Sequence, residues 1–305
     1  MSYDAIVIGG SFAGLSAALQ LARARRRVLV IDAGQPRNRL AAFSHGFLTQ
    51  DHKPPRQIIA QGRRQLAAYP TVEFVNGEAV EARPQDSGFL VALQNGRTEL
   101  TSRLVLAIGV RDELPDLPGL AQRWGETVLH CPYCHGYEVQ GQALGVLATH
   151  ARSTRQALLV PDWGPTTYFT QGIVELTDDE KDQLTNREVQ LETVPIVELL
   201  GEAPALDAVR LADNRIVRIQ ALFTAPRTHV SSALADQLGC SFEEGPVGRY
   251  IKVDDSKQTT VPRVYAAGDA ASATSNATVA AAAGVLAGIN AHQSLFMDGS
   301  CVTAR

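Results

Sequence analysis

The chain has 305 residues, of which 45% are hydrophobic and 20% charged, and its formal net charge is −4. This length provides for two domains, or for one large α/β domain that carries an insertion. The slightly acidic balance lacks the positive excess of nucleic-acid-binding proteins, so no nucleic acid is expected as a partner.

The sequence shows no pattern of export or of a membrane anchor. It runs from MSYDAIVIGG directly into a predicted strand, without the charged, apolar and small-residue segments of a secretory signal. The longest apolar stretches, among them the alanine-rich residues 277–288, are shorter than a membrane span. We therefore expect a cytoplasmic protein that does not contact a membrane.

Residues 4–32 predict a strand, a glycine turn, a helix and a second strand. In VIGGSFAGLSAA, Gly9, Ser11 and Gly14 occupy the glycine positions of the G-x-G-x-x-G dinucleotide fingerprint. These positions allow a tight turn, close approach of a pyrophosphate and close helix–strand packing, and the alternative is a plain turn. Asp32 ends the second strand, where a carboxylate accepts ribose hydroxyls. The expected nucleotide contacts are Gly9, Gly10, Ser11, Phe12, Ala13, Gly14, Asp32 and Ala33.

The following segments predict mixed structure and then a hinge. A polar loop at 34–55 leads into an amphipathic helix near 55–68. Short strands are expected near 72–81, 88–94 and 97–101, and a buried strand at 103–110. RDELPDLPG, residues 111–119, holds three turn signals and predicts a hinge between domains.

A second block predicts a strand at 143–149, a helix near 151–160 and a strand at 166–170. This block resembles the first βαβ unit as a weak internal repeat that has lost its glycines. EEGPVGRY, residues 243–250, predicts the return hinge, and VYAAGDA is followed by a small-residue helix near 277–295.

HCPYCHG, residues 130–136, places Cys131 and Cys134 between two histidines. Such a pair can hold zinc, form a structural clip or act as a reversible disulfide. Zinc needs about four ligands, and no second CxxC or spaced histidine pair follows, so no metal site is predicted. A reducing cytosol disfavours structural disulfides, which favours redox chemistry. Cys240 and Cys301 stand alone and are interpreted as a buried thiol and a tail thiol.

The glycine turn, the central CxxC and the late VYAAGDA together resemble the low-molecular-weight thioredoxin reductases over essentially the whole chain. This resemblance implies a homodimeric flavoprotein with FAD as cofactor. It also implies an α/β fold with two Rossmann-like domains of the glutathione-reductase type, the smaller inserted into a discontinuous FAD domain. The implied boundaries are 1–113 and 243–305 for the FAD domain and 114–242 for the inserted domain.

The resemblance also implies roles for single residues. Cys134 is expected to face the flavin and Cys131 to attack the partner, with His135, and less directly His130, moving protons. Asp269 is expected at the FAD ribityl chain, and the helix start at Ala277 and Thr278 near the flavin pyrimidine. The further expected FAD contacts are Arg37, Asn38, His45, Gln50, Ala79, Ala107, Gly109 and Gly268, although the loop that holds the first four also reads as an ordinary surface loop.

One departure from the family concerns the second nucleotide site. Relatives that use NADPH carry another G-x-G-x-x-A motif, but here LGVLATHARSTRQA has Ala148, Thr149 and His150 where glycines are expected. Side chains at these positions obstruct a pyrophosphate. We therefore expect no NADPH binding of the usual kind. Arg152 and Arg155 suggest a phosphate contact or, more simply, a solvated helix face.

HCPYCHGYE in place of the usual CATCDG resembles a subgroup that includes gliotoxin-type dithiol oxidases and deeply rooted or ferredoxin-dependent thioredoxin reductases. Three hypotheses follow. The first is a reductase that passes electrons from ferredoxin or a similar donor to thioredoxin or another dithiol protein. The second is a dithiol oxidase that passes electrons to O₂, and the third is a flavin-binding relative without activity. The role of the tail FMDGSCVTAR stays open.

Overall fold

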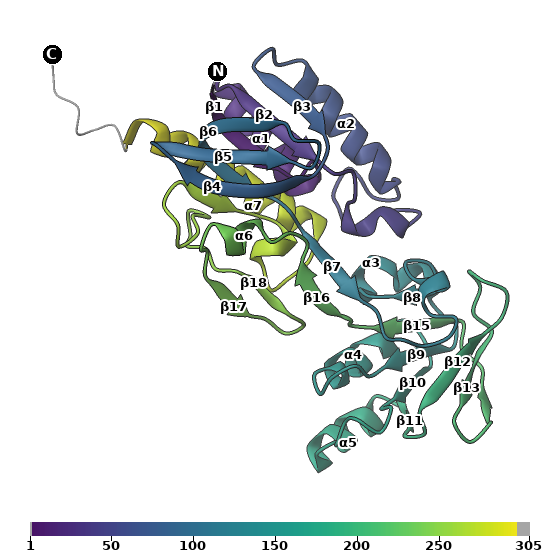
Figure 1. The fold of residues 1–305 in the computed structure, drawn as a ribbon. Coiled ribbons are helices and arrows are strands. Elements are labelled where there is room, and N and C mark those ends of the chain that lie inside the picture. The colour runs from purple at the N-terminus through teal and green to yellow at the C-terminus, as the bar shows by residue number, and fades with distance from the viewer. Residues whose placement is uncertain (1, 298–305) are drawn as a thin grey trace, which may run out of the picture. The chain divides into compact units, whose positions relative to one another are not determined.

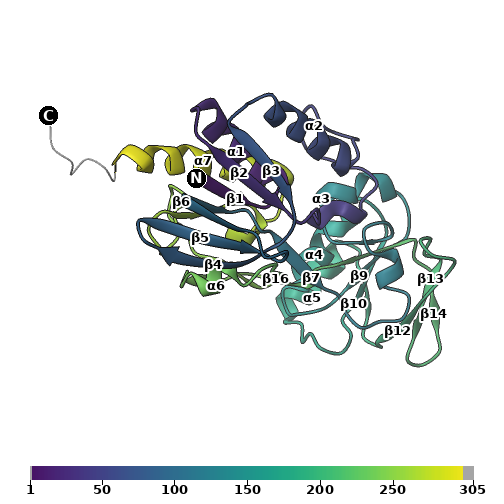
Figure 2. The same cartoon turned by 45° about the horizontal axis from the view of Figure 1, so that its top comes forward.

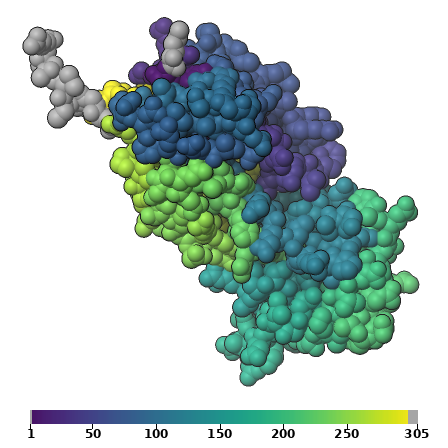
Figure 3. All heavy atoms as spheres, in the orientation of Figure 1, coloured from purple at the N-terminus to yellow at the C-terminus, as the bar shows by residue number. Residues whose placement is uncertain are grey.

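The computed structural model describes residues 2–297 and divides into two compact units. Unit 1 combines the stretches Met1–Arg39, Arg56–Arg111 and Thr228–Arg305, and unit 2 combines Leu40–Pro55 with Asp112–Arg227. In Figure 1 the blue strands and the yellow helix near the C-terminus therefore share unit 1, and in Figure 3 the blue and the yellow-green atoms of this unit adjoin one another.

Unit 1 is built on a mainly parallel sheet with strand order β3-β2-β1-β6-β5-β4, and β19 pairs with β6 beside this path. β4 and β5 form an antiparallel extension, whereas the other strands are parallel. Buried apolar runs form the parallel strands because helices cover them. The strands are β1 (Tyr3–Ile8), β2 (Val28–Asp32), β3 (Val72–Asn76), β4 (Ala79–Gln85), β5 (Gly88–Leu93), β6 (Thr98–Leu106) and β19 (Val264–Ala266). A hairpin of β17 (Phe242–Glu244) and β18 (Arg249–Ile251) also belongs to unit 1.

β6 corrects one sequence prediction. Residues 97–101 and 103–110 were expected as two strands, but Thr98–Leu106 is one strand. Its first half pairs with β5 and its last three residues pair with β19. The change of partner explains the break that the sequence pattern suggests.

Helices α1 (Phe12–Arg23) and α7 (Ala277–Met297) pack on each other along small residues. A Cβ on Gly284 would collide with the Ala13 backbone, and one on Gly288 with the Ala17 backbone. α7 has 21 residues and is long and apolar enough to cross a membrane, so the expectation that this segment is too short was wrong. A third of its most apolar window, 33%, is buried, and packing on α1 accounts for its composition. The other helices of unit 1 are α2 (Pro55–Ala67), α6 (Leu234–Gln237), and the short η1 (Arg37–Leu40) and η5 (Asp269–Ala271).

Unit 2 has a five-stranded sheet of order β11-β10-β9-β15-β8 and a three-stranded sheet of order β12-β13-β14 (Figure 2). One hydrophobic cluster lies between the five-stranded sheet and helices α4 and α5, and another lies between this sheet and the smaller one. The strands are β8 (Val128–Leu129), β9 (Leu144–Leu147), β10 (Thr166–Phe169), β11 (Gln190–Glu192), β12 (Ile196–Leu200), β13 (Ala208–Leu211), β14 (Ile216–Val217) and β15 (Ala221–Thr224). The helices are α3 (Pro132–His135), α4 (Ser153–Leu159), α5 (Asp178–Asn186) and the short η2 (Ala121–Arg123), η3 (Tyr137–Val139) and η4 (Val160–Asp162).

The unit boundaries differ from the predicted domains in two places. The chain enters unit 2 close to the expected hinge, through β7 (Val110–Glu113), which pairs with β16 (Arg227–Val230). It returns at 227/228 rather than at 242/243, because Leu234, Leu238 and Cys240 pack in the unit 1 core. Residues 40–55, expected in the FAD domain, belong to unit 2.

Candidate functional site

The residues predicted to bind a nucleotide collect at one edge of the unit 1 sheet. β1, β2, β6 and β19 are parallel and end level with one another in the strand register. In open parallel sheets, ligands bind outside the carboxyl ends of the strands. The turns that follow these ends hold Gly9–Gly14, Asp32–Ala33, Ala107–Gly109 and Gly268–Asp269.

The turn after β1 has the tightness that the fingerprint requires. Gly9 has a φ of +110°, and a Cβ there would collide with the Ala107 carbonyl. A Cβ on Gly10 would overlap the Asp32 carboxylate, and one on Gly14 would overlap the Gly9 carbonyl. The Gly10 N–H donates to Asp32 Oδ1 at 3.2 Å. The turn therefore fits a pyrophosphate at the start of α1, where N–H groups are exposed to a ligand.

Arg63 is a member of this edge that the sequence did not single out. Its Nη1 donates to Asp32 Oδ2 at 2.9 Å, and its Nη2 donates to Asn76 Oδ1 at 2.9 Å. The guanidinium also lies over the Phe74 ring, 4.8 Å from its centroid. An arginine on an amphipathic helix usually faces solvent, so only the placement of α2 could reveal this role.

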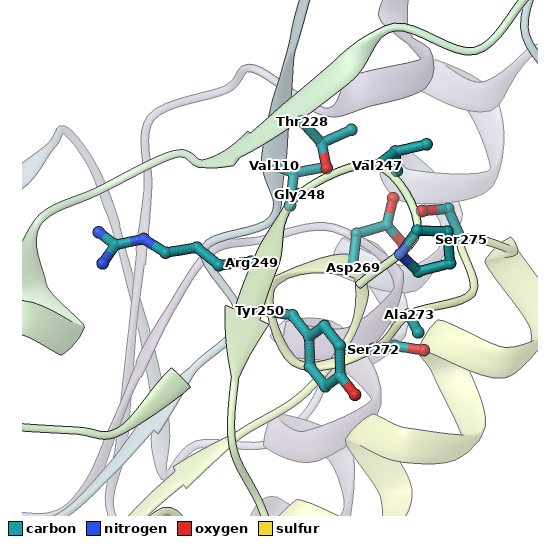
Figure 4. A pocket seen from close by; sticks show the side chains of 11 residues that line it. Val110, Thr228, Val247, Gly248, Arg249, Tyr250, Asp269, Ser272, Ala273 and Ser275 are labelled. Atoms are coloured by element: carbon teal, nitrogen blue, oxygen red, sulfur yellow. The ribbon is translucent and has the colours of Figure 1, made fainter. Parts of the chain in front are cut away.

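Two predicted cofactor residues that are 232 positions apart form an ion pair. Arg37 Nη1 lies 3.1 Å from Asp269 Oδ2, and the side chains are only 17% and 19% exposed. Asp269 follows Gly268, whose φ of +79° sets the turn. Figure 4 shows Asp269 in a shallow pocket with Tyr250, while Arg249 extends away from it.

The other residues of unit 1 that were predicted to contact the cofactor lie in β4, in η1 and at the start of α7. Ala79 begins β4 and is buried in the hydrophobic core. Asn38 lies in η1. α7 begins at Ala277 as expected, and Asn276 Oδ1 accepts a hydrogen bond from the Thr278 N–H at 2.8 Å. The roles of these residues toward a cofactor stay predictions.

Cys131 and Cys134 form a disulfide in unit 2, with their Cα atoms 5.2 Å apart. Cys131 is the N-cap of α3, and the Cys134 N–H donates to the Cys131 carbonyl at 3.1 Å. α3 has only four residues. One turn offers a thiolate its free N–H groups and little of a macrodipole.

Two further points are whether side chains are arranged to hold a metal ion and where the other two cysteines lie. Within residues 2–297, no group of three or more His, Cys, Asp or Glu side chains is arranged to hold a metal ion. Cys240 is a free thiol in the unit 1 core, and burial raises its pKa. Cys301 and residues 298–305 of the tail lie outside the described residues.

The histidines beside the disulfide differ in their surroundings. Burial lowers the pKa of His135, the nearby Glu138 carboxylate opposes this shift, and His45 adds to it. The His130 carbonyl accepts a hydrogen bond from Gln156 Nε2 at 2.8 Å, which ties the segment to α4. Tyr133 is 74% exposed and meets Trp163 edge to face.

The four residues of the loop that were predicted to contact FAD are divided between the two units. Arg37 and Asn38 lie in unit 1, but His45 and Gln50 lie in unit 2. His45 Nε2 lies 3.4 Å from Glu138 Oε1, and Lys53 Nζ donates to Gln50 Oε1 at 3.1 Å. The sequence did not indicate the contact with Glu138, because the spacing along the chain does not show that this loop lies beside η3.

The turn between β9 and α4 differs from the turn after β1. The Thr149 and His150 N–H groups donate to Ser153 Oγ at 3.1 and 3.4 Å, and Thr149 Oγ1 donates to the Ala225 carbonyl at 2.7 Å. Amides that a pyrophosphate would need are thus already paired within the chain. Gly145 lies inside β9, where a Cβ would meet Ile219 and Leu222 side chains, so it serves packing.

Comparisons with known proteins agree with this architecture. The family model described as pyridine nucleotide-disulphide oxidoreductase matches residues 3–149 and 173–284. The thioredoxin reductase sirT of Leptosphaeria maculans is 33% identical over 94% of this chain and 92% of its own length. The thioredoxin reductase tcpT of Claviceps purpurea is 31% identical over 97% of this chain and 95% of its own length.

A solved structure gives the same result. The oxidoreductase from Agrobacterium tumefaciens has a TM-score of 0.93 and 47% identity, covering 97% of this chain and 99% of its own. Proteins of this family bind FAD. The turn after β1 and the sheet edge of unit 1 stay the predicted place of this cofactor. The chain therefore belongs to the pyridine nucleotide-disulphide oxidoreductase family and is an enzyme, a low-molecular-weight thioredoxin reductase-like flavoprotein with two Rossmann-like units.

Proposed function

We propose that the protein is an FAD-dependent thiol–disulfide oxidoreductase that exchanges electrons between its flavin and Cys131–Cys134, and then with a dithiol or disulfide partner such as thioredoxin. The observation that carries this proposal is the Cys131–Cys134 disulfide, formed in a chain whose family binds FAD. Bound FAD supplies or accepts the electron pair. Reduction breaks the S–S bond and takes up two protons, and oxidation by a partner disulfide reverses both changes.

The two cysteines have different proposed tasks. Cys134 communicates with the flavin, and Cys131 attacks the partner disulfide as a thiolate. His135 accepts a proton from these thiols, since its lowered pKa favours the neutral imidazole at neutral pH. The curated relatives sirT and tcpT, both named thioredoxin reductases, support a thioredoxin-type partner.

We propose that the enzyme does not use NADPH. The β9–α4 turn supports this, because its amides are paired with Ser153 Oγ. The family match also omits residues 150–172, which include α4 and β10. Ferredoxin or another one-electron carrier is the proposed donor. A basic docking patch for an acidic ferredoxin could be formed by Arg23, Arg25, Arg26 and Arg27 at the end of α1, although the helix end explains these residues equally well.

An anaerobic titration of the yellow protein tests the proposal. We expect NADPH to leave the flavin absorbance unchanged, whereas a ferredoxin system bleaches it and thioredoxin is then reduced. Rapid bleaching by NADPH would contradict the assignment of residues 145–155. In a separate aerobic assay, oxygen consumption driven by small dithiols, without thioredoxin reduction, would instead indicate a dithiol oxidase.

Cys134→Ser tests the role of the disulfide. We expect this variant to keep FAD and its visible spectrum but to lose electron transfer to thioredoxin by at least about 1,000-fold, since the Cys131–Cys134 disulfide can no longer form. Cys240→Ser is the matched control, because it removes a buried thiol of unit 1 and should turn over as the wild type does. Full activity of Cys134→Ser would rule out the proposed path.

A further inference from the structure

Helix α7, which lies beside α1 (Figure 2), has an apolar face that this packing does not cover. Its buried face consists of small residues, Ala280, Gly284, Ala287, Gly288 and Ala291. The opposite face carries larger side chains that are between 37% and 53% exposed, namely Val279, Leu286, Ile289 and Phe296. Ala282 and Gln293, also exposed, lie between them, and we call these six residues the α7 stripe. Packing on α1 thus explains the small residues of α7 but not the α7 stripe.

α7 also lacks the charged residues that normally cover the solvent face of a surface helix. Its 21 residues, Ala277–Met297, contain no Asp, Glu, Lys or Arg. Gln293 is the one polar member of the α7 stripe. Contiguous exposed apolar surface marks a place where another molecule binds. The α7 stripe is therefore an interaction surface.

The spacing of the α7 stripe is the same in both directions. Its six members follow one another at intervals of three, four, three, four and three residues. Such alternating intervals are the pattern with which two helices pack side by side. Two antiparallel copies therefore match about a two-fold axis, with Leu286 of one protomer facing Ile289 of its partner. The outer pairs are Val279 with Phe296 and Ala282 with Gln293.

We propose that the α7 stripe is the contact surface of a homodimer in which the two copies of α7 pack antiparallel about this axis. The resemblance in sequence implies a homodimer but does not say which surface forms it. A two-fold axis brings a surface against its own copy, so a charge near the axis would meet a like charge. α7 carries no Asp, Glu, Lys or Arg and meets this requirement along its whole length.

Two other molecules that could cover the α7 stripe match it less well. The eight residues after Met297, DGSCVTAR, include no leucine, isoleucine, methionine or aromatic residue, so this tail offers little apolar surface to cover four larger side chains. A helix that binds a membrane surface carries Lys or Arg on its polar face, and α7 has neither. A second copy of the chain supplies the matching apolar surface without either difficulty.

Sedimentation equilibrium of the full-length, FAD-loaded protein tests the inference. We expect the wild type to have the mass of two chains at micromolar concentration. Leu286→Glu puts a charge at the centre of the α7 stripe, where the dimer would bury it, so the dimer dissociation constant should rise at least about 100-fold. Val80→Glu is the matched control, because Val80 is a similarly exposed residue of unit 1 on β4, and it should stay dimeric. Both variants should keep their flavin absorbance and circular dichroism.

Cross-linking tests the orientation of the two helices, with every variant made in a Cys301→Ser background so that the tail thiol takes no part. In the double variant Val279→Cys, Phe296→Cys, each new thiol faces one of the partner, and mild oxidation should link the chains. Either single variant places its two thiols about 25 Å apart, 17 residues along the helix, and should stay unlinked. The parent protein controls for the native cysteines.

A wild-type dimer, its dissociation by Leu286→Glu and a link confined to the double variant support the inference. A dimer that survives Leu286→Glu, or a link in a single variant, would overturn it. A monomeric wild type would also overturn it; dimerisation after deletion of residues 298–305 would then indicate the tail as the cover, and binding to phosphatidylglycerol vesicles would indicate a membrane. None of these measurements needs an electron donor or a dithiol partner, so their outcome is separate from that of the proposed function.

Discussion

At the edge of the unit 1 sheet where the cofactor is predicted to bind, some residues are important because they lack a side chain that would displace a neighbour. Gly10 is the clearest case, because a methyl group there would occupy the position of the Asp32 carboxylate. That carboxylate is in turn held by Arg63. The sequence could name Gly10 and Asp32 from the fingerprint spacing, but Arg63 depends on packing between α2 and β3.

Gly10→Ala should therefore displace Asp32 and weaken FAD binding. We expect an unfolding free energy lower by about 1–3 kcal/mol and a protein purified with less flavin. Gly77→Ala is the control, since its Cβ would meet only the flexible end of Leu93 at 3.5 Å. The flavin-to-protein absorbance ratio and urea unfolding measure both effects, and equal flavin content in the two variants would contradict the role of Gly10.

Among the elements, the α1–α7 pair shows how small residues set the spacing of the layers. Gly284 and Gly288 let α7 approach the Ala13 and Ala17 backbone of α1. The sequence predicted the α7 helix from its composition, because alanine favours helices. It could not predict that β6 is one strand, since the change of partner from β5 to β19 depends on residues far along the chain.

Gly288→Ala and Gly62→Ala should change stability in opposite directions. Alanine gains helix propensity over glycine by roughly 0.5–1 kcal/mol, but at Gly288 the methyl group would collide with the Ala17 backbone, a strain of about 1–3 kcal/mol. At Gly62 it meets only the Leu15 side-chain end at 3.1 Å, so we expect a small gain. Thermal unfolding with saturating FAD distinguishes these cases; a stabilised Gly288→Ala variant would mean that α7 shifts freely on α1.

At the scale of the whole molecule, unit 1 is assembled from stretches near both ends of the chain. The predicted cofactor site also combines residues that are far apart in the sequence, since Arg37 and Asp269 form an ion pair. The resemblance in sequence correctly anticipated the Rossmann-like fold, whereas the FAD contacts that it implies stay predictions. It did not anticipate that residues 40–55 join unit 2 or that the return lies at 227/228, because both follow from core contacts rather than from turn signals.

Deletion of residues 264–305 should abolish FAD binding and leave unit 1 unfolded. It removes β19, Asp269 and α7, and it exposes the face of α1 that includes Ala17 and Ala18, both fully buried. Deletion of residues 298–305 is the control and should keep FAD, because every predicted contact lies before it. Circular dichroism and flavin content measure the outcome, and a folded, yellow protein lacking 264–305 would contradict this assembly.

The membership of residues 40–55 in unit 2 has a consequence for chimeric enzymes. The chain passes between the units at 39/40, 55/56, 111/112 and 227/228, so unit 2, which holds the disulfide, cannot be transplanted as one continuous segment. If only residues 112–227 are transplanted, the loop 40–55 with its histidine comes from the recipient, whereas the residue at the position of Glu138 comes from the donor. Exchange of partner specificity between relatives should therefore succeed only when both segments are transplanted together.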